Sequence, residues 1–349
     1  MKIAQVSPLY EAVPPKLYGG TERVVSYLSD ALVALGHDVT LFASGDSITD
    51  AKLEPAWPRA LRLDDTIRDP IAPHVAMVEM VARRAREFDL IHLHCDHIGY
   101  PLMSRINVPV VSTLHGRLDM AELASIYHLY PNIPLVSISD SQRIFLPDAN
   151  FVATVLHGLP NDLLSAGPGD GGYLAFLGRI SPEKGPDAAI RIAGAAGMKL
   201  KIAAKVDKAD RDYFATQIAP MLEQPHVEFI GEINEHEKRD FLGKATALLF
   251  PIDWPEPFGL TMIETIACGT PVIARRRGSV PEIIDDGVTG YIVDDEAQAV
   301  SAIKRLHRLN RHEIRRVFEE RFTARRMAMN YLEVYHQLTT HVPTRLRAT

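Results

Sequence analysis

Two glutamates, Glu256 and Glu264, stand with seven residues between them in a segment that could bind an anionic, hydroxyl-rich ligand. Glu256 lies between two prolines, and a residue before a proline avoids the α region, so extended backbone is expected there. Gly259 then permits a tight turn, and the apolar run from Leu260 to Ala267 predicts a short helix. The start of a helix attracts anions through its free N–H groups. The segment therefore predicts an anion site flanked by two carboxylates, which suits a diphosphate joined to a sugar.

A second segment, residues 176–185, places two cations where they could meet the phosphates of such a ligand. An apolar strand is expected to end at Gly178, and a helix to begin near Gly185. Arg179 and Lys184 therefore fall on the loop between them, at the edge where open α/β sheets bind ligands. Two cations there could neutralise a diphosphate leaving group as its negative charge grows.

Two further features follow strands in the first half of the chain. Gly19 and Gly20, after Tyr18, would let backbone approach a ligand without a Cβ in the way. The Gly-x-Gly-x-x-Gly dinucleotide fingerprint is absent there. His115, in the segment 112–116, ends the strand expected at 110–115. A histidine at a strand end either contacts a ligand or serves as a structural hydrogen-bonding group, and the residue alone leaves both open.

Together these segments resemble the donor-binding signature of the retaining family 4 glycosyltransferases, nucleotide-sugar enzymes of the two-domain GT-B fold. The resemblance is carried by Pro-Glu-Pro-Phe-Gly-Leu-Thr at 255–261, by Gly-Thr-Pro-Val-Ile at 269–273 and by Gly-Arg-Ile-Ser-Pro-Glu-Lys-Gly at 178–185. It extends over nearly the whole chain and is densest from residue 172 to residue 293.

The resemblance implies a role for each residue of the second half. Glu256 would bind hydroxyls of the transferred sugar, and Glu264 the ribose hydroxyls of the nucleotide. Arg179 and Lys184 would contact the diphosphate. The backbone amides that hold the diphosphate would be those of Gly259, Leu260 and Thr261.

The resemblance also implies roles in the first half. The loop with Gly19 and Gly20 would face the sugar and the diphosphate, and His115 would touch the donor sugar. His115 and Glu256 are therefore the expected catalytic residues. The turn at 231–233 would meet the nucleobase through backbone, so its side chains say little about which base is bound.

The histidines near residue 95 are a candidate metal site. On a strand, His92 and His94 share a face, whereas Asp96 and His97 fall in the following loop, a poor geometry for one ion. The single Asp-x-Asp spacing, at 210–212, lies outside the motifs. We expect no metal requirement and no cofactor, because a nucleotide sugar is a co-substrate.

Composition predicts an ordinary globular enzyme of two domains. The 349 residues are 46% hydrophobic and 23% charged, and the net charge of −6 gives no sign of nucleic-acid binding. Residues 301–349 hold 11 Lys/Arg against 4 Asp/Glu, a balance of +7. This basic tail either makes a weak peripheral contact with an anionic membrane or solvates the final helices. The two cysteines, Cys95 and Cys268, and the lack of a signal segment or spanning run predict a cytoplasmic protein.

Strands and helices alternate throughout, as in parallel sheets with crossover helices. Strands are expected at 3–7, 38–43, 90–94, 110–115, 135–139, 152–157, 173–178, 200–204, 227–230, 248–251, 271–274 and 290–293. The fold predicted is α/β of the GT-B type, with two Rossmann-like parallel-sheet domains facing a cleft. Their limits are expected at 1–165 for the acceptor-side domain and 166–322 for the nucleotide-sugar-binding domain. Residues 323–349 are expected to form a terminal helix that crosses back to the first domain, with an apolar stripe of Tyr331, Val334, Tyr335 and Leu338.

The predicted function is transfer of a hexose from a nucleoside diphosphate sugar, with UDP-glucose as the first guess, to an unidentified acceptor. The acceptor could be a small metabolite, a polysaccharide or a lipid. A sugar-nucleotide epimerase or a glycoside phosphorylase of the same fold is one alternative. A non-catalytic sugar-nucleotide-binding protein is another, and the presence of both glutamates and both cations argues against it.

Overall fold

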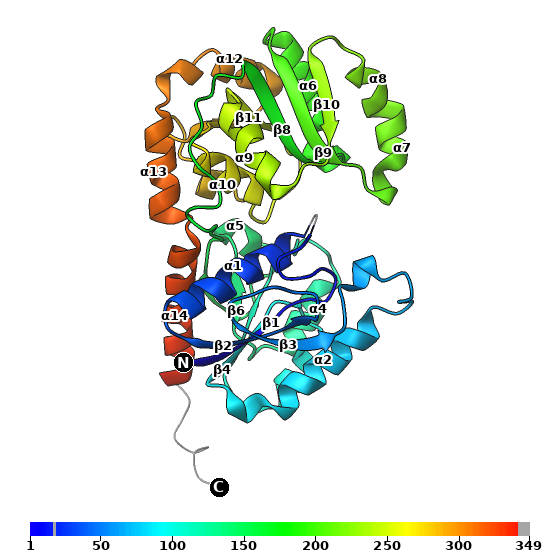
Figure 1. The fold of residues 1–349 in the computed structure, drawn as a ribbon, viewed down its shortest axis with the longest axis vertical. Helices are drawn as coiled ribbons and strands as arrows, with labels where there is room; N and C mark the ends of the chain where they lie inside the picture. The colour runs from blue at the N-terminus through cyan, green and yellow to red at the C-terminus, as the bar shows by residue number, and fades with distance from the viewer. Residues whose placement is uncertain (17–18, 341–349) are drawn as a thin grey trace. The chain divides into compact units, whose positions relative to one another are not determined.

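The computed structural model describes residues 1–16 and 19–340, which form two compact units (Figure 1). Unit 1 comprises residues 1–158 and the final helix, and unit 2 comprises residues 159–323. Each unit contains one parallel β-sheet flanked by helices, so the α/β class with two Rossmann-like sheets is confirmed. Tyr18, part of the glycine loop singled out in the sequence, lies outside the described residues.

Seven parallel strands form the sheet of unit 1, in the order β3-β2-β1-β4-β5-β6-β7. They are β1 (Lys2–Val6), β2 (Asp38–Ser44), β3 (Lys52–Trp57), β4 (Leu90–Leu93), β5 (Val110–Thr113), β6 (Leu135–Ser137) and β7 (Phe151–Thr154). The sequence predicts all of them except β3, whose Pro55 weakens the strand pattern. β3 lies at the sheet edge, and there a residue without an N–H is tolerated.

The helices of unit 1 connect these strands and cover their apolar side chains. They are α1 (Gly20–Ala34), α2 (Ile71–Arg83), α3 (Tyr100–Met103), α4 (Leu123–Leu129), α5 (Asp140–Arg143) and α14 (Ala324–Thr340), with short 3₁₀ turns at Leu61–Leu63 and Ala85–Glu87. α1 buries the predicted stripe that includes Val24, Val25 and Leu28. Gly36 follows the helix with a φ of 86°, which suits a glycine at this position.

Six parallel strands form the sheet of unit 2, in the order β10-β9-β8-β11-β12-β13. They are β8 (Tyr173–Arg179), β9 (Lys199–Lys205), β10 (Val227–Gly231), β11 (Ala247–Phe250), β12 (Val272–Arg275) and β13 (Gly290–Val293). All six were predicted, because their apolar runs are bounded by clear turn residues. β8 and β11 are neighbours, so the segments that follow them emerge at the same edge of the sheet.

The helices of unit 2 form two groups: α6 packs on α12, and α10 packs on α9 and α13. The helices are α6 (Pro186–Ala195), α7 (Arg211–Tyr213), α8 (Ala219–Leu222), α9 (Glu235–Lys244), α10 (Leu260–Ala267), α11 (Val280–Ile283), α12 (Glu296–Ile303) and α13 (Arg311–Arg321). A π-helical turn, Phe214–Ile218, joins α7 to α8, and 3₁₀ turns occur at Pro182–Lys184, Lys208–Asp210 and Leu306–Arg308.

The chain passes into unit 2 after Gly158, ahead of the expected limit at 165. The residues that follow are held by α13 and its C-terminal end. The backbone N–H of Leu159 donates to the carbonyl of Phe322 at 2.9 Å, and the guanidinium of Arg315 donates to the carbonyl of Leu164 at 2.6 Å. These bonds attach the start of the glycine-rich linker to unit 2.

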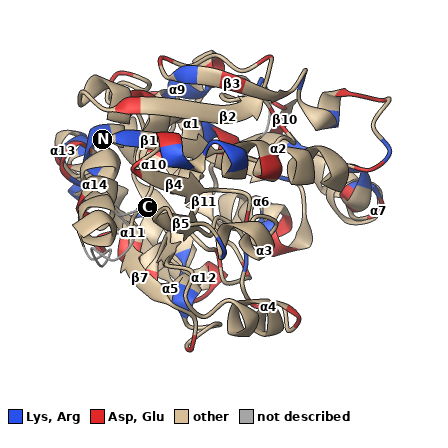
Figure 2. Cartoon of the chain, turned by 90° about the horizontal axis from the view of Figure 1, so that it is seen from below, with Lys and Arg blue, Asp and Glu red and all other residues tan. Residues whose placement is uncertain are grey.

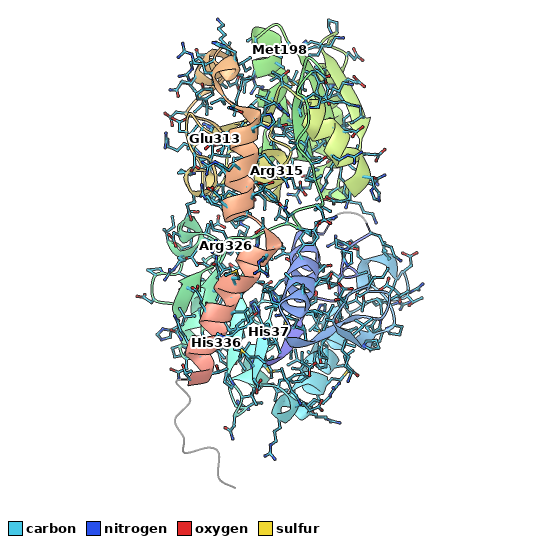
Figure 3. The ribbon with its side chains drawn as sticks, turned by 60° about the vertical axis from the view of Figure 1, so that its left-hand side comes forward. His37, Met198, Glu313, Arg315, Arg326 and His336 are labelled. Carbon is cyan, nitrogen blue, oxygen red and sulfur yellow. The ribbon has the colours of Figure 1, made fainter. Side chains whose placement is uncertain are left out.

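The final helix, α14, belongs to unit 1 and packs on α1 (Figure 3). Tyr331, Val334 and Tyr335 of its expected stripe are buried. His37, just after α1, and His336 of α14 lie on neighbouring parts of this surface (Figure 3), and burial together with the nearby charges lowers the pKa of His37. The apolar stripe therefore covers the sheet domain formed by the first half of the chain.

Many arginines of the basic C-terminal region form ion pairs or hydrogen bonds within unit 2, and α13 carries both basic and acidic residues (Figure 2). Arg315 donates to the carbonyls of Asn161 and Ala267 as well as to Leu164. Arg321 pairs with Asp285 at 2.8 Å. These cations serve the fold of unit 2. Arg345 and Arg347 lie outside the described residues. Within residues 1–16 and 19–340, no helix is both long enough and apolar enough to cross a bilayer.

Candidate active site

The loop between β11 and α10 carries Glu256 and ends at Gly259, as the sequence predicts. Glu256 is 7% exposed. Gly259 has a φ of 83°, in the left-handed region that favours glycine, and a Cβ there would come within 2.8 Å of Cε of Met262. The helix starts at the next residue, Leu260. The N–H groups of Leu260 and Thr261 therefore lie in the first helical turn, where backbone donors have no acceptor within the helix.

The loop after β12 holds the Glu256 segment in place. Gly278 has a φ of 50°, and a Cβ there would lie 2.3 Å from the carbonyl oxygen of Glu256 and 2.4 Å from its nitrogen. The next residue, Ser279, donates its N–H to the same carbonyl at 3.0 Å and its hydroxyl to the carbonyl of Phe258 at 2.7 Å. Neither residue was among the expected site residues, although a Gly-Ser pair with two residues between it and a buried strand is a turn signal.

Lys184 and Glu256 form an ion pair, although 72 positions separate them in the chain. Lys184 ends the 3₁₀ turn that follows β8, and Glu256 follows β11, so the adjacency of these strands brings the two motifs together. The indole N–H of Trp254 donates to the same Oε2 of Glu256 at 3.0 Å. The ammonium of Lys184 also lies 4.9 Å from the centre of the Trp254 ring. Trp254 is a further residue that the motif analysis missed.

Arg179, the second expected phosphate ligand, ends β8 among three carboxylates. It forms an ion pair with Glu183, and its nitrogens lie 3.6 Å from a carboxylate oxygen of Asp207 and of Asp210. Desolvation opposes ionisation of Glu183, but hydrogen bonds, including those from Ser181 and Arg179, outweigh it and lower the pKa of this carboxyl. A diphosphate that binds Arg179 must therefore compete with these carboxylates.

Glu264 lies on α10 and is 3% exposed. The ammonium of Lys238, on α9, donates to its Oε1 at 2.7 Å and to Glu235 at 3.3 Å. α9 is fixed at its start by Asn234, which accepts from the N–H groups of the first turn. Sequence reasoning could not find Lys238 because it lies on a different helix, 26 positions from Glu264.

In unit 1, Gly19 and Gly20 lie at the start of α1. Gly19 is buried and has extended backbone, and a Cβ there would lie 2.8 Å from Cβ of Pro15. The absence of a side chain at Gly19 therefore makes room for Pro15 in the preceding loop of the same chain. Glu22, in the first turn of α1, accepts from the N–H of Glu11 at 3.3 Å, and burial raises the pKa of Glu22. Gly20 begins the helix and is exposed.

His115 lies just beyond β5 and bonds to His94. Its Nε2 is 2.9 Å from Nδ1 of His94, and its ring stacks on that of His157 with 5.2 Å between centroids. His92 bonds to Thr113 and to Tyr335 of α14. In the described part of the chain, no three or more His, Cys, Asp or Glu side chains are grouped to hold a metal ion.

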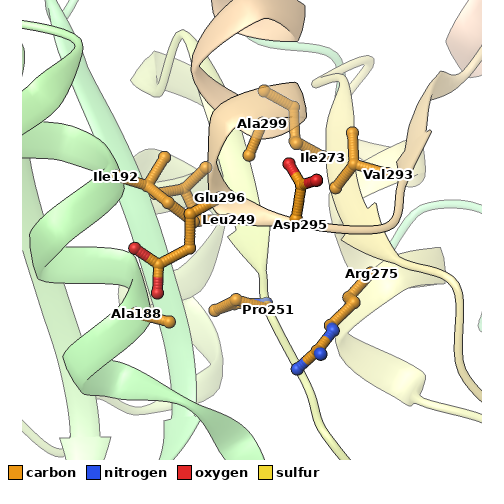
Figure 4. A pocket seen from close by; sticks show the side chains of 10 residues that line it. All are labelled: Ala188, Ile192, Leu249, Pro251, Ile273, Arg275, Val293, Asp295, Glu296 and Ala299. Atoms are coloured by element: carbon orange, nitrogen blue, oxygen red, sulfur yellow. The ribbon is translucent and has the colours of Figure 1, made fainter.

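Unit 2 also has a hollow of about 260 Å³ between α6 and α12 (Figure 4). Its floor is apolar and includes Ile192 and Leu249. Charged side chains surround it, but the structure already uses them: Asp295 caps α12, Glu296 pairs with Arg191 at 2.7 Å, and Arg275 pairs with an aspartate at 3.0 Å. No role in the chemistry is assigned to it.

Lys184 and Glu256 are thus in direct contact. Arg179, at the end of β8, and Glu264, on α10, belong to the same unit. Gly19, Gly20 and His115 belong to unit 1. The residues that sequence reasoning missed, Trp254, Gly278 and Lys238 among them, orient or neutralise the predicted ones.

Solved structures define the class of this fold. A sucrose-phosphate synthase from Thermosynechococcus elongatus superposes with a TM-score of 0.79 at 20% identity, covering 97% of this chain and 99% of that one. Anabaena Alr3699/HepE in complex with UDP-glucose superposes with a TM-score of 0.72 at 18% identity, covering 97% and 100%. At these identities the likeness shows the fold alone, which is GT-B.

Sequence comparison gives the family. Residues 165–324 match the model of the glycosyl transferases group 1, and residues 18–167 match that of glycosyltransferase family 4. The glycogen synthase of Mycobacterium tuberculosis H37Rv is 28% identical, over 83% of this chain and 81% of the relative. The phosphatidyl-myo-inositol mannosyltransferase of Mycobacterium leprae is 26% identical, over 93% and 90%. The chain belongs to the family 4 glycosyltransferases and is a transferase of the GT-B type.

Proposed function

We propose that this protein is a retaining hexosyltransferase that uses a nucleoside diphosphate sugar as donor. The observation that carries the proposal is the convergence of Lys184, Glu256 and the start of α10 in unit 2. A cation, a sugar-binding carboxylate and a turn of free N–H groups are the three elements that a sugar diphosphate requires.

Each group has a role in this proposal. Arg179, Lys184 and the amides of the first α10 turn hold the diphosphate and meet the charge that grows on it as the glycosidic bond breaks. Glu256 binds hydroxyls of the transferred hexose. Glu264, on the second turn of α10, binds the ribose hydroxyls. His115 contacts the donor sugar from unit 1.

Retention of configuration follows in this proposal from attack on one face of the sugar. The acceptor oxygen bonds to the anomeric carbon on the face from which the diphosphate leaves. The bond to the diphosphate oxygen breaks with its electron pair, and that oxygen takes the proton of the acceptor hydroxyl. This step uses no enzyme nucleophile, because the acceptor oxygen attacks the sugar directly. It needs no metal ion, because the two cations and the helix start supply the positive charge.

The comparisons suggest which substrates to test first. UDP-glucose is bound in one structural neighbour, so it is the first donor. Glycogen synthase, D-inositol 3-phosphate glycosyltransferase and phosphatidyl-myo-inositol mannosyltransferase are among the relatives. Glycogen, inositol 3-phosphate and phosphatidylinositol are therefore the first acceptors, one from each of the polysaccharide, small-metabolite and lipid classes.

The test is a screen of UDP-, ADP- and GDP-sugars for slow hydrolysis by the full chain, followed by addition of the acceptors. Transfer with the donor's anomeric configuration in the product, read by NMR, is expected. Conversion of the donor to an epimer without acceptor would indicate an epimerase, and consumption of a glycoside with free phosphate would indicate a phosphorylase. Tight donor binding without turnover under any of these conditions would leave only a binding protein.

A further inference from the structure

A continuous chain of hydrogen bonds runs through the interior of unit 1, from His115 to the terminal helix. Nε2 of His115 is 2.9 Å from Nδ1 of His94, and Nε2 of His94 is 2.7 Å from Oε1 of Gln5, on β1. Nε2 of Gln5 is 3.1 Å from the hydroxyl of Tyr335, on α14. That hydroxyl is 2.7 Å from Nδ1 of His92.

The chain then continues back into the sheet. Nε2 of His92 is 2.7 Å from Oγ1 of Thr113, which is 3.0 Å from the hydroxyl of Tyr331, also on α14. Apart from His115, which is partly exposed, every side chain in this series is buried. Each link must therefore consist of one donor and one acceptor, since an unmatched polar group inside a protein is costly.

The amide of Gln5 gives the chain a direction. Its Oε1 can only accept, so His94 carries its proton on Nε2 and its Nδ1 is an acceptor. His115 must then donate from Nε2. At the other end, the amide nitrogen of Gln5 donates to Tyr335. The hydroxyl of Tyr335 donates in turn to His92, so every later link follows head to tail.

The opposite direction would require the Gln5 amide to be turned over and would place a proton on Nδ1 of His115. That atom is buried and meets no hydrogen-bond partner among the described residues. A buried N–H without an acceptor is among the rarest features of folded proteins, and an acceptor with a spare lone pair is less costly. The direction set by Gln5 as placed is therefore the favoured one.

The histidines of the chain are uncharged. Burial, and to a lesser extent the neighbouring histidines, hold the pKa of His92 and of His94 well below the usual range. Burial lowers the pKa of His115 to about 3. Each neutral ring then carries a single proton, and the hydrogen-bond chain determines which of the two ring nitrogens holds it.

We propose that Gln5 and Tyr335 are positioning residues that fix the neutral tautomer of His115, leaving its Nδ1 as a hydroxyl acceptor for the sugar substrate. His115 follows β5 at the carboxyl edge of a parallel sheet, where ligands of such folds bind. Its Nδ1 has no hydrogen-bond partner among the described residues, although the ring itself is partly exposed, so a small shift of the ring on substrate binding would present an unused lone pair to a sugar hydroxyl. With the other tautomer, an N–H would meet that hydroxyl and the acceptor would be lost.

The tautomer can be measured without any substrate, by nitrogen NMR of the full chain labelled with ¹⁵N-histidine. His115 is assigned by loss of its signals in His115→Gln. In the unaltered protein, Nδ1 of His115 should resonate as a pyridine-type nitrogen and Nε2 as a pyrrole-type nitrogen carrying the proton. Gln5→Leu and Tyr335→Phe should shift both signals toward averaged positions. A pyrrole-type Nδ1 in the unaltered protein, or unchanged signals in both variants, overturns the proposal.

The consequence for turnover rests on the proposed function. Gln5→Leu and Tyr335→Phe should each lower kcat by about tenfold, the size of one lost hydrogen bond to a buried group, with UDP affinity unchanged. In a His115→Gln background, neither should cause further loss, because both act through His115. Losses that multiply in that background would show a merely structural role and overturn the proposal.

The matched control is Tyr100→Phe. Tyr100 is another buried tyrosine of unit 1, and its hydroxyl donates to Ser112 at 3.0 Å, outside the chain described above. This variant should leave both the His115 signals and kcat unchanged. If the unaltered protein turns over no nucleotide sugar, the proposed function fails, and the NMR result still decides the tautomer. A tenfold loss in Tyr100→Phe equal to that in Tyr335→Phe would count against the proposal.

Discussion

The ammonium of Lys184 is paired with Oε2 of Glu256, the carboxylate expected to bind the transferred sugar. Their segments are tied by a second bond, from the N–H of Asp253 to the carbonyl of Glu183 at 2.9 Å. A phosphate oxygen that approaches Lys184 must share it with Glu256, and a sugar hydroxyl that approaches Glu256 must compete with Lys184. Under the proposed roles, the pair would couple the diphosphate and sugar positions, and a donor carrying both groups would replace both halves of one interaction.

The first prediction concerns the two cations. Lys184→Ala and Arg179→Ala should each weaken UDP binding by roughly 1.5–3 kcal/mol, the range for a hydrogen bond to a charged group. The lower end is expected, since carboxylates already neutralise both side chains. Titration calorimetry with UDP measures the loss. Lys244→Ala, which removes an exposed lysine paired with Asp240 on the same unit, should have no effect. Unchanged UDP affinity in both test variants would mean that this loop does not hold the diphosphate.

The second prediction separates the two glutamates. Glu256→Gln should lower turnover strongly while leaving UDP affinity equal or slightly higher, because it removes the counter-charge of Lys184. Glu264→Gln should weaken UDP itself, because this residue is assigned to ribose. UDP calorimetry on the two variants, beside donor turnover, distinguishes the roles. The reverse pattern, with UDP weakened by Glu256→Gln alone, would exchange the assignments.

Much of this arrangement could be predicted from the sequence because its signals are local. The turn at Gly259 and the helix after it depend on neighbouring residues, and the structure has both. The strands of unit 2 are apolar runs bounded by turn residues, and all six could be predicted from them. β3 was missed because its edge position, which makes Pro55 acceptable, is a property of the folded sheet.

The partners of the site residues could not be predicted, because they come from other parts of the fold. Lys238 reaches Glu264 only because α9 packs on α10. The link between Gln5 and Tyr335 spans 330 positions and depends on the return of α14 to unit 1. A motif shows which groups could do chemistry, whereas their ionic and hydrogen-bonding partners depend on packing.

A third prediction tests the support that Gly278 gives to Glu256. Gly278→Ala places a methyl group within 2.4 Å of the Glu256 backbone and should displace this loop, lowering both stability and turnover. Gly287→Ala is the matched control: Gly287 also has a positive φ, of 79°, but a Cβ there meets nothing within 4 Å. Both variants place an alanine at a positive φ, which costs about 1–3 kcal/mol of stability. A greater loss of turnover in Gly278→Ala would therefore come from the clash with the Glu256 backbone. Equal losses in the two variants would argue against it.

A fourth prediction concerns acid stability. Among the histidines of unit 1 whose pKa is lowered by burial are His92, His94, His115 and His157. Below the unfolded value of about 6.5 the unfolded chain binds protons that the folded unit does not. Stability then falls as the pH drops, by up to about 1.4 kcal/mol per pH unit for each histidine. Burial raises the pKa of Glu22, Asp30 and Asp96, which acts in the opposite direction but through fewer groups.

The two tryptophans allow each unit to be followed separately in this experiment. Trp57 is on β3 of unit 1 and Trp254 is in unit 2, so Trp254→Phe reports on unit 1 and Trp57→Phe reports on unit 2. Urea unfolding by fluorescence at pH 7 and pH 5 should show a marked loss of stability for unit 1 and a smaller one for unit 2. Equal changes, or a unit 1 that gains stability in acid, would contradict the assignment of neutral buried histidines.

The last prediction is that transfer does not require a divalent metal. Departure of a nucleoside diphosphate places additional negative charge on the leaving group, and some positive element must meet it. We assign that task to Arg179, Lys184 and the helix start at Leu260, all of which lie in unit 2 beside neighbouring strand ends. Activity, or slow donor hydrolysis if no acceptor is found, should therefore persist in excess EDTA within about a factor of two, because the same cations continue to neutralise the leaving group.

The control is Lys184→Ala assayed with and without manganese. If the lysine acts in place of a metal, its loss should lower the rate in both conditions. Abolition by EDTA with recovery on added manganese would show that a metal ion, and not these side chains, stabilises the departing diphosphate.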